Sequence, residues 1–207
     1  MSDLTFYTHP MSRGRIIRWM LEEVGAPYDT RIIGFGSDMK AGEYTAINPM
    51  GKVPAIKHGK VVVTECAAIC AYLADAFPEK GLAPPTGDRG LYYRWLFFAA
   101  GPLEMGITNR ALGLIIPEDK YRMAGCGRFE DLMDTLEYAV TQNPFIAGDS
   151  FTAADVYVGS HIVWGQQFGS LEKRQAFSDY LGRLGQRPAF LRAQEIDDAV
   201  IREMQPA

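Results

Sequence analysis

The spacing of the apolar residues changes within the first 25 positions of the chain. Leu4, Phe6 and Thr8 alternate with Asp3, Thr5 and Tyr7, which is typical of a short β-strand. After Pro10, apolar residues recur every three or four positions instead, as they do along one face of a helix. These residues are Ile16, Ile17, Met20, Leu21 and Val24. The pattern therefore predicts a strand followed closely by a helix.

A second strand follows this helix. Gly25 and Pro27 supply a helix stop, and residues 28–33 predict the strand. The order strand–helix–strand implies a parallel pair of strands joined by a right-handed crossover. Residues 34–48 have a weaker pattern, for which we expect one short helix.

The next segment predicts a hairpin and a further helix. Residues 52–57 and 60–64 are the expected strands, and His58-Gly59 is the turn between them. From Glu65 to Phe77 the apolar residues form a single helical stripe, which Pro78 ends. The first eighty residues therefore have the order βαβ followed by ββα.

The composition changes after residue 80, which indicates a domain boundary. Residues 81–87 are rich in proline and glycine and predict a linker. Beyond the linker no convincing strand pattern occurs, and four segments suit helices. These are 91–112, 121–140, 153–164 and 176–184. We therefore expect an α/β domain over residues 1–80 and an all-α domain over residues 88–207.

The charge of the chain argues against nucleic-acid partners, and its cysteine content indicates a reducing compartment. The 207 residues include 21 Lys and Arg against 25 Asp and Glu, for a formal net charge of −4. Nucleic-acid binding needs clustered cations, which this chain lacks. Three cysteines, Cys66, Cys70 and Cys126, are too few for a disulfide scaffold and fit a reducing compartment. With no signal-peptide pattern and no apolar run near the ~20 residues of a membrane span, we expect a cytoplasmic protein without a membrane partner.

Three motifs in this order resemble one known family. The βαβ–ββα order with Val53-Pro54 before the third strand resembles thioredoxin-like domains, in which this proline is cis. Residues 64–74, Thr-Glu-Cys-Ala-Ala-Ile-Cys-Ala-Tyr-Leu-Ala, are similar to the glutathione-binding segment of glutathione S-transferases. Residues 145–155 resemble the capping motif of that family's helical domain, and Thr152 with Asp155 has capping-box spacing. The resemblance to cytosolic-type glutathione S-transferases spans nearly the whole chain.

The resemblance implies a glutathione site in the first domain. Glu65 would bind the ammonium of the γ-glutamyl group, and the backbone of Cys66 would bind its carboxylate at a helix start. The family usually has serine at this position, and a thiol is a weaker donor, so only the backbone role carries over. Val53, before Pro54, would pair its backbone with the cysteinyl part, and Lys52 would meet the glycyl carboxylate. Glu65 also suits a first-turn helix acid, and Lys52 a solvated surface charge.

The reaction that this resemblance implies needs the glutathione sulfur as a thiolate. A thiol titrates near 8.5, so a dominant thiolate at pH 7 needs a shift of about two units, or about 2–3 kcal/mol. One charge-assisted hydrogen bond supplies about 1.5–3 kcal/mol, and a helix N-terminus adds about 0.3–1 kcal/mol. A single hydroxyl at the start of the first helix is therefore sufficient.

Two hydroxyls compete for this role. Counted back from Gly25, Tyr7 falls at the family's tyrosine-type position and Met11 at its serine-type position, one residue before Ser12. A one-residue loop shift is easily accommodated, and a strand aromatic often serves the core. We therefore take Ser12 as the activator and Tyr7 as the alternative. Ser12 also suits plain capping of the first helix.

A second substrate, a small hydrophobic electrophile, would bind beside the glutathione. Residues 96–104 are aromatic-rich and contain a Gly101-Pro102 break that would kink a helix. We expect Met11, Phe98 and Met105 to line the pocket, although most aromatics of this segment also suit an ordinary helical core. The histidines show no metal-ligand spacing. The expected site therefore holds no metal, and glutathione acts as a co-substrate rather than a cofactor.

Three functions fit these residues. The leading one is a glutathione transferase, for which the resemblance implies a symmetric homodimer. A glutathione-dependent peroxidase or disulfide reductase would use the same site, but residues 7–15 contain no cysteine, and Cys66 with Cys70 lacks the spacing of a redox pair. A non-catalytic interaction module is the third, and the retained Glu65 and Val53-Pro54 argue against it.

Overall fold

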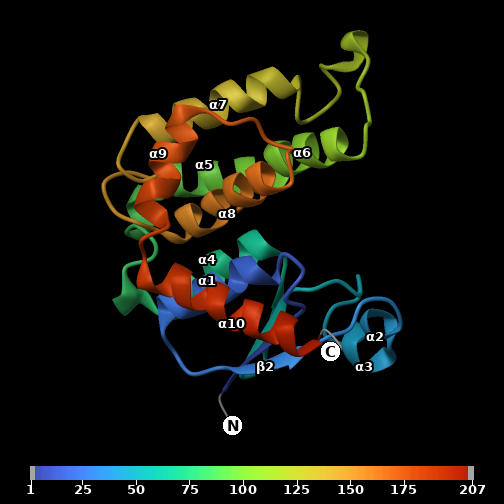
Figure 1. The fold of residues 1–207 in the computed structure, drawn as a ribbon. Coiled ribbons are helices and arrows are strands. Elements are labelled where there is room, and N and C mark those ends of the chain that lie inside the picture. The colour runs from blue at the N-terminus through green and yellow to red at the C-terminus, as the bar shows by residue number, and fades with distance from the viewer. Residues whose placement is uncertain (1–2, 205–207) are drawn as a thin grey trace. The chain divides into compact units, whose positions relative to one another are not determined.

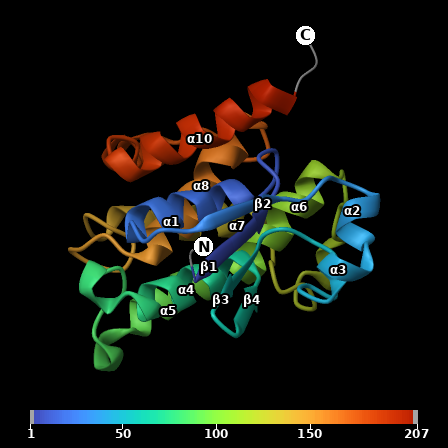
Figure 2. The same cartoon turned by 90° about the horizontal axis from the view of Figure 1, so that it is seen from below.

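Four strands form one mixed sheet, of which Figure 1 labels β2, in the order β2–β1–β3–β4 that Figure 2 labels in full. The central strand β1 (Leu4–Thr8) pairs in parallel with β2 (Asp29–Ile32) and antiparallel with β3 (Ala55–His58). The hairpin to β4 (Val61–Thr64) turns at Gly59, whose φ of +57° suits glycine. The predicted βαβ–ββα order is confirmed.

The two faces of β1 have different surroundings. Leu4, Phe6 and Thr8 are buried, whereas Tyr7 lies on the opposite face and is half-buried. Two adjacent helices, α1 (Gly14–Val24) and α4 (Cys66–Ala76), pack against the sheet, and every residue of the predicted apolar stripe of α1 is buried. The α1 helix ends at Gly25, as its sequence predicts.

The segment after β2 differs from the expectation of one short helix. It forms two, α2 (Ser37–Lys40) and α3 (Gly42–Thr45), beside the sheet (Figure 2). The α3 residue Tyr44 is buried, and its ring centroid lies 5.9 Å from that of Tyr7. The α3 helix therefore lies on the face of β1 that carries Tyr7.

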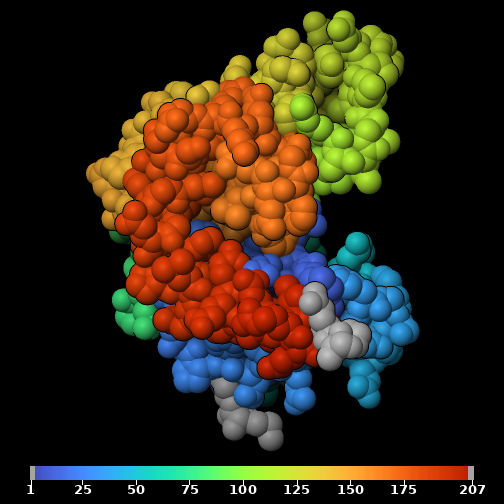
Figure 3. All heavy atoms as spheres, in the orientation of Figure 1, coloured from blue at the N-terminus to red at the C-terminus, as the bar shows by residue number. Residues whose placement is uncertain are grey.

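The structure, a computed structural model, describes residues 3–204 and divides into two compact units. Unit 1 comprises the chain up to Lys80 together with the segment from Gln186 onward, and unit 2 is Gly81–Gly185. The sequence placed a boundary after residue 80 too, but it grouped the last helix with the helical domain. That helix, α10 (Pro188–Met204), packs against α1, and Figure 3 shows it as a continuous band on the surface of unit 1.

Unit 2 is helical, as the sequence predicts. Its helices are α5 (Gly90–Phe98), α6 (Glu104–Ala111), α7 (Phe129–Thr141), α8 (Ala153–Gln167) and α9 (Gln175–Leu184). Short 3₁₀ turns cover Thr86–Asp88 and Glu118–Lys120 in unit 2, and Pro78–Lys80 just before it in unit 1. Within residues 3–204, no helix combines the length and the apolar character that crossing a membrane requires.

Two predicted helices of unit 2 differ in extent from the observed ones. The expected helix over 91–112 is interrupted by a π-helical turn, Ala99–Leu103, at the Gly101-Pro102 break that the sequence indicates. Because proline has no N–H to donate, the chain widens the helix there instead of continuing it. The expected helix over 121–140 begins only at Phe129, after Gly127 adopts a left-handed φ of +61°.

The start of α8 has the predicted capping box. The hydroxyl of Thr152 accepts the Ala154 amide at 3.3 Å, and the carboxylate of Asp155 accepts the Thr152 amide at 2.8 Å. The same carboxylate also accepts the Ile146 amide and the Tyr180 hydroxyl, each at 2.8 Å. Asp155 therefore ties the preceding loop and α9 to the start of α8, which is a structural role.

Candidate functional site

The starts of α1 and α4 lie together in unit 1. The thiol of Cys66, the first residue of α4, donates to the carbonyl of Arg13, the residue before α1, at 3.8 Å. The first amides of a helix have no partner within it, and the helix dipole is positive there. The first three amides of α1 already donate to Ser12 and Arg13, so at that helix start the dipole is what favours anionic groups at this edge of the sheet.

The loop between β1 and α1 is held by its own hydrogen bonds. The hydroxyl of Ser12 donates to the His9 carbonyl at 2.7 Å, and the Ser12 amide donates to the same carbonyl at 3.0 Å. The Gly14 amide in turn donates to the Ser12 hydroxyl oxygen at 3.0 Å. Because the His9 carbonyl keeps the amide bond, the Ser12 hydroxyl can turn to another acceptor without leaving that carbonyl unpaired.

The alternative activator, Tyr7, has a different environment. It lines an open hollow with residues of β2, α2 and α3, among them Arg31, Asp38 and Tyr44. Ser12 is not among the described residues that line this hollow. The structure therefore separates the surroundings of the two hydroxyls that the sequence left in competition.

The peptide bond between Val53 and Pro54 is cis, as the resemblance implied. The carbonyl of Lys52 accepts the Tyr44 hydroxyl at 2.6 Å and the Asn48 side-chain amide at 2.7 Å. Burial is the main cause that raises the pKa of Tyr44 to about 12, so this hydroxyl remains a donor at neutral pH. The Lys52 side chain is exposed. The backbone before Val53 is therefore fixed by two side chains.

Sequence reasoning missed both of these side chains. Asn48 precedes Pro49, a pair that favours a turn, and that turn brings the Asn48 amide to the Lys52 carbonyl. The signal in the sequence indicates a turn but not its partner. Nothing in the spacing of Tyr44 points to the same carbonyl.

Glu65 adopts a backbone conformation that is rare for its residue type. Its φ of 68° and ψ of 122° make it the one non-glycine residue with positive φ among residues 3–204. Such a conformation costs about 1–3 kcal/mol and is concentrated at functional sites. A first-turn helix acid needs no such backbone, so this geometry favours a ligand role for the exposed Glu65 side chain.

The two cysteines of α4 lie one helical turn apart and are both buried. Burial raises the pKa of the Cys70 thiol well above its usual value, so this group stays protonated at neutral pH. Cys66 and Cys70 are free thiols, as is Cys126. In the part of the chain that the structure describes, no group of three or more His, Cys, Asp or Glu side chains is placed to hold a metal ion.

The residues expected to contact an electrophile are divided between the units. Met11 is exposed in unit 1. In unit 2, Phe98 is half-buried and packs edge-on against Trp95 with centroids 5.6 Å apart, and Met105 is exposed. The structure thus leaves apolar surface at two of the three positions.

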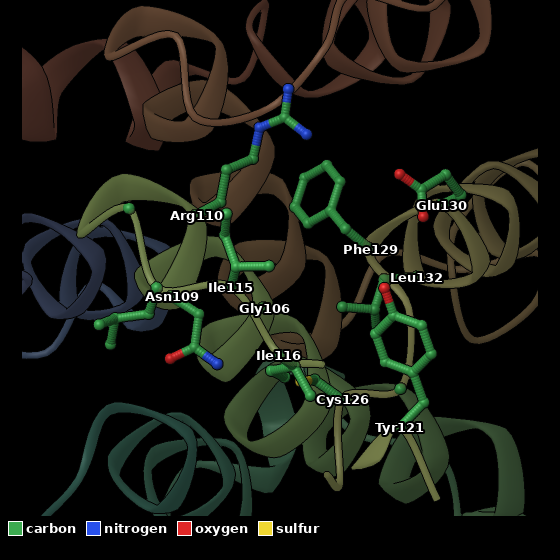
Figure 4. A pocket seen from close by; sticks show the side chains of 13 residues that line it. Gly106, Asn109, Arg110, Ile115, Ile116, Tyr121, Cys126, Phe129, Glu130 and Leu132 are labelled. Atoms are coloured by element: carbon green, nitrogen blue, oxygen red, sulfur yellow. The ribbon is translucent and has the colours of Figure 1, made fainter. Parts of the chain in front are cut away.

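A separate cavity of about 290 Å³ lies within unit 2, at the end of α6 and the start of α7 (Figure 4). Its walls include Ile115, Ile116, Leu132 and Phe129, and the guanidinium of Arg110 lies 4.4 Å from the centroid of the Phe129 ring. Neither Phe98 nor Met105 lines it. The sequence did not reveal this cavity because part of its lining comes from the 121–128 segment, which was expected to be helical.

Fold and site together define a class. A mixed sheet with a cis proline before β3, and with the starts of α1 and α4 in contact, is a thioredoxin-like domain, and a helical unit follows it. The protein is therefore of the class in which a helical unit follows a thioredoxin-like domain.

Comparison with known proteins narrows this class. The family model described as "Glutathione S-transferase, N-terminal domain" matches residues 11–76. Glutathione S-transferase GstA of Escherichia coli O157:H7 is 29% identical over 167 residues, 78% of each chain. Disulfide-bond oxidoreductase YghU of Escherichia coli K12 is 26% identical over 219 residues, 94% of this chain and 75% of the relative.

One solved structure is similar to this chain over nearly the whole length of both. The theta class glutathione S-transferase of Xanthomonas axonopodis pv. citri, solved with glutathione bound, superposes with a TM-score of 0.75 at 25% identity. The match covers 93% of this chain and 97% of that one. Residues 11–76 therefore match the N-terminal domain of glutathione S-transferases, and the chain is similar to members of that family over most of its length.

Proposed function

We propose that this protein is a glutathione transferase whose glutathione site lies at the joined starts of α1 and α4. The observation that carries the proposal is the strained backbone of Glu65 at the start of α4, next to the Cys66 thiol that contacts Arg13. A carboxylate and a helix start side by side match the two opposite charges of the γ-glutamyl group.

Each part of glutathione has a partner in this arrangement. The γ-glutamyl carboxylate binds the backbone amide of Cys66, and the ammonium binds the side chain of Glu65. The backbone of Val53 pairs with the cysteinyl part, as in strand addition. Lys52 attracts the glycyl carboxylate. The bonds from Tyr44 and Asn48 to the Lys52 carbonyl support this assignment, since they hold the Val53 backbone in place.

Ser12 activates the thiol in this proposal. Its hydroxyl oxygen already accepts the Gly14 amide, and a hydroxyl that accepts one hydrogen bond becomes a better donor. Turning the hydroxyl from the His9 carbonyl to the glutathione sulfur replaces a neutral hydrogen bond with a charge-assisted one of about 1.5–3 kcal/mol, which favours the thiolate. The thiol releases its proton to solvent, the resulting thiolate attacks an electrophilic carbon, and the leaving group departs with the electron pair of the bond that breaks.

The second substrate is a small hydrophobic electrophile. Met11, at the glutathione end of α1 in unit 1, supplies an apolar contact for it. Conjugation of such electrophiles serves detoxification. The three free thiols support a reducing location such as the cytoplasm.

Disulfide reduction with glutathione is the second candidate, and the similarity to the disulfide-bond oxidoreductase favours it. That reaction uses the same thiolate of glutathione but a sulfur electrophile instead of a carbon one. Among the chain's own thiols, Cys66 is buried against the Arg13 carbonyl and Cys70 is fully buried, so neither suits an exchange step. Parallel assays with a carbon electrophile and a glutathione mixed disulfide separate the two reactions.

The test of the glutathione site is Glu65→Gln, which keeps the size and shape of the side chain and removes its charge. Calorimetry with glutathione should show an affinity about ten- to a hundredfold lower, since a charged hydrogen bond is worth about 1.5–3 kcal/mol. Glu79→Gln, another exposed acid of unit 1, is the matched control and should bind as the wild type does. Equal affinities for the two variants would contradict the proposed role of Glu65.

A further inference from the structure

His9 closes a turn in the way that aspartate or asparagine side chains usually do. Its Nδ1 accepts the amide of Met11, two residues ahead, at 3.2 Å. Asn and Asp make the same bond to the amide two residues on, and it stabilises a turn without help from the rest of the backbone. The side chain of His9 therefore shapes the β1–α1 loop directly.

The His9 ring is held in place by packing. The residue is buried, and its ring centroid lies 3.9 Å from that of Phe35 with an interplanar angle of 37°. Because Nδ1 accepts a hydrogen bond, the ring proton lies on Nε2. Burial also lowers the pKa of His9, so the ring is neutral at pH 7 and Nδ1 stays an acceptor.

The same residue also holds Ser12. The His9 carbonyl accepts both the amide and the hydroxyl of Ser12, and the Ser12 hydroxyl accepts the Gly14 amide. His9 thus fixes Met11 through its ring and Ser12 through its carbonyl. A change at the ring releases Met11 and thereby alters the direction in which the adjacent Ser12 hydroxyl is presented.

We propose that His9 is a positioning residue for thiol activation, which acts by holding the Met11 amide and thereby the Ser12 hydroxyl in register with the glutathione sulfur. This inference rests on the proposed function and deepens it. His9 itself makes no contact with the sulfur in this proposal. Misplacing a catalytic group by about 1 Å is enough to cost a reaction rate up to a hundredfold.

Two substitutions separate this role from simple packing. His9→Asn places Oδ1 where the imidazole has Nδ1, so it keeps the bond to Met11 and loses the stacked ring. His9→Phe keeps a ring against Phe35 and loses the acceptor. If His9 serves only to pack against Phe35, His9→Phe should retain more activity than His9→Asn. If His9 positions the loop through its hydrogen bond to Met11, His9→Asn should retain more activity than His9→Phe.

The experiment measures kcat, KM for glutathione, the pKa of bound glutathione and the melting temperature for both variants. His9→Phe should lower kcat about tenfold and raise the thiol pKa, while KM for glutathione changes less than threefold. His9→Asn should restore kcat to within about threefold of the wild type, although its melting temperature is lower. His58→Phe, the same change at a half-buried histidine elsewhere in unit 1, should leave kcat unchanged.

The outcomes distinguish a failure of the His9 proposal from a failure of the proposed function. An active His9→Phe variant, or a His9→Asn variant as impaired as His9→Phe, would overturn the positioning role while leaving the glutathione site intact. Wild-type protein that binds no glutathione in calorimetry would overturn the proposed function itself, and the role of His9 with it.

Discussion

Gly14 lies where the end of β1 and the start of α1 come closest. A Cβ atom at this position would lie 1.9 Å from the Thr8 hydroxyl oxygen and 3.1 Å from that of Ser12. The Thr8 side chain is completely buried, so the added methyl group has no open space beside it. Position 14, which lies against both the Thr8 side chain of the sheet and the Ser12 hydroxyl, therefore requires glycine.

We expect Gly14→Ala to lower the free energy of unfolding by about 1–3 kcal/mol, the usual cost of overpacking a tight site. Gly182→Ala is the matched control, because a Cβ atom there meets no atom within 4 Å and the residue lies inside α9. That change should stabilise the protein by about 0.5–1 kcal/mol. Urea unfolding measures both, and an equally stable Gly14→Ala variant would show that α1 can move away from β1.

At this scale the sequence predicted several residues of the candidate site, whose roles stay predictions. Glu65, Cys66 and Val53-Pro54 follow from the family resemblance, and the structure adds the positive φ of Glu65. The roles of Tyr44, Asn48 and His9 could not be predicted. Each depends on a hydrogen bond to a particular backbone group, and the composition of a loop does not specify which group that is.

At the scale of elements, a buried ion pair joins α1 to α10. Arg18 Nε lies 3.2 Å from Asp197 Oδ1, and the two side chains are only 2% and 1% exposed. The guanidinium also donates to the hydroxyls of Tyr28 and Thr30, at 3.0 and 2.9 Å. Loss of one charge would leave the other buried without its ionic partner.

We expect Arg18→Met or Asp197→Leu alone to cost about 3–5 kcal/mol of stability, because each leaves an uncompensated buried charge. The double variant should recover most of that loss, since apolar residues can replace both ions. Arg192→Ala, which removes a more exposed bridge to Glu22, should cost at most about 1 kcal/mol. Single variants that unfold like the wild type would contradict an α10 anchored by this pair.

The same helix shows why some elements escape prediction. The buried residues of α10 are Ala189, Ala193 and Asp197, each four positions after the last. The stripe has helical spacing, but it consists of two small residues and one charged residue, so a search for large apolar residues passes over it. Helices with larger buried residues, such as α1, were predicted almost to their ends.

At the scale of the whole molecule, the family resemblance implies a homodimer. On α5, Tyr93 and Phe97 lie one turn apart with ring centroids 6.4 Å apart, and the side chain of Phe97 is 70% exposed. Two aromatic rings on the surface of a helix suit the self-complementary face that a two-fold axis requires. A second copy of this chain is the occupant that we assign to this face.

If the chain forms the homodimer that the resemblance implies through this face, Phe97→Asp should convert it into a monomer, because a two-fold interface would bury the new charge of both copies. Sedimentation at micromolar concentration measures the mass. Phe168→Asp, at a residue 74% exposed after the end of α8, is the control and should remain dimeric. A wild-type protein that sediments as a monomer would exclude this assembly.

The central claim is that the joined starts of α1 and α4 ionise the glutathione thiol through Ser12. It is tested most directly by the ultraviolet absorbance of the bound thiolate as a function of pH. Wild-type protein should hold glutathione with a thiol pKa about two units below the value of about 8.5 for a free thiol. Ser12→Ala should return the pKa towards that value with little loss of affinity, and Tyr7→Phe should keep the low pKa. The reverse result, a lost thiolate in Tyr7→Phe and a retained one in Ser12→Ala, would contradict the account and assign the activation to Tyr7.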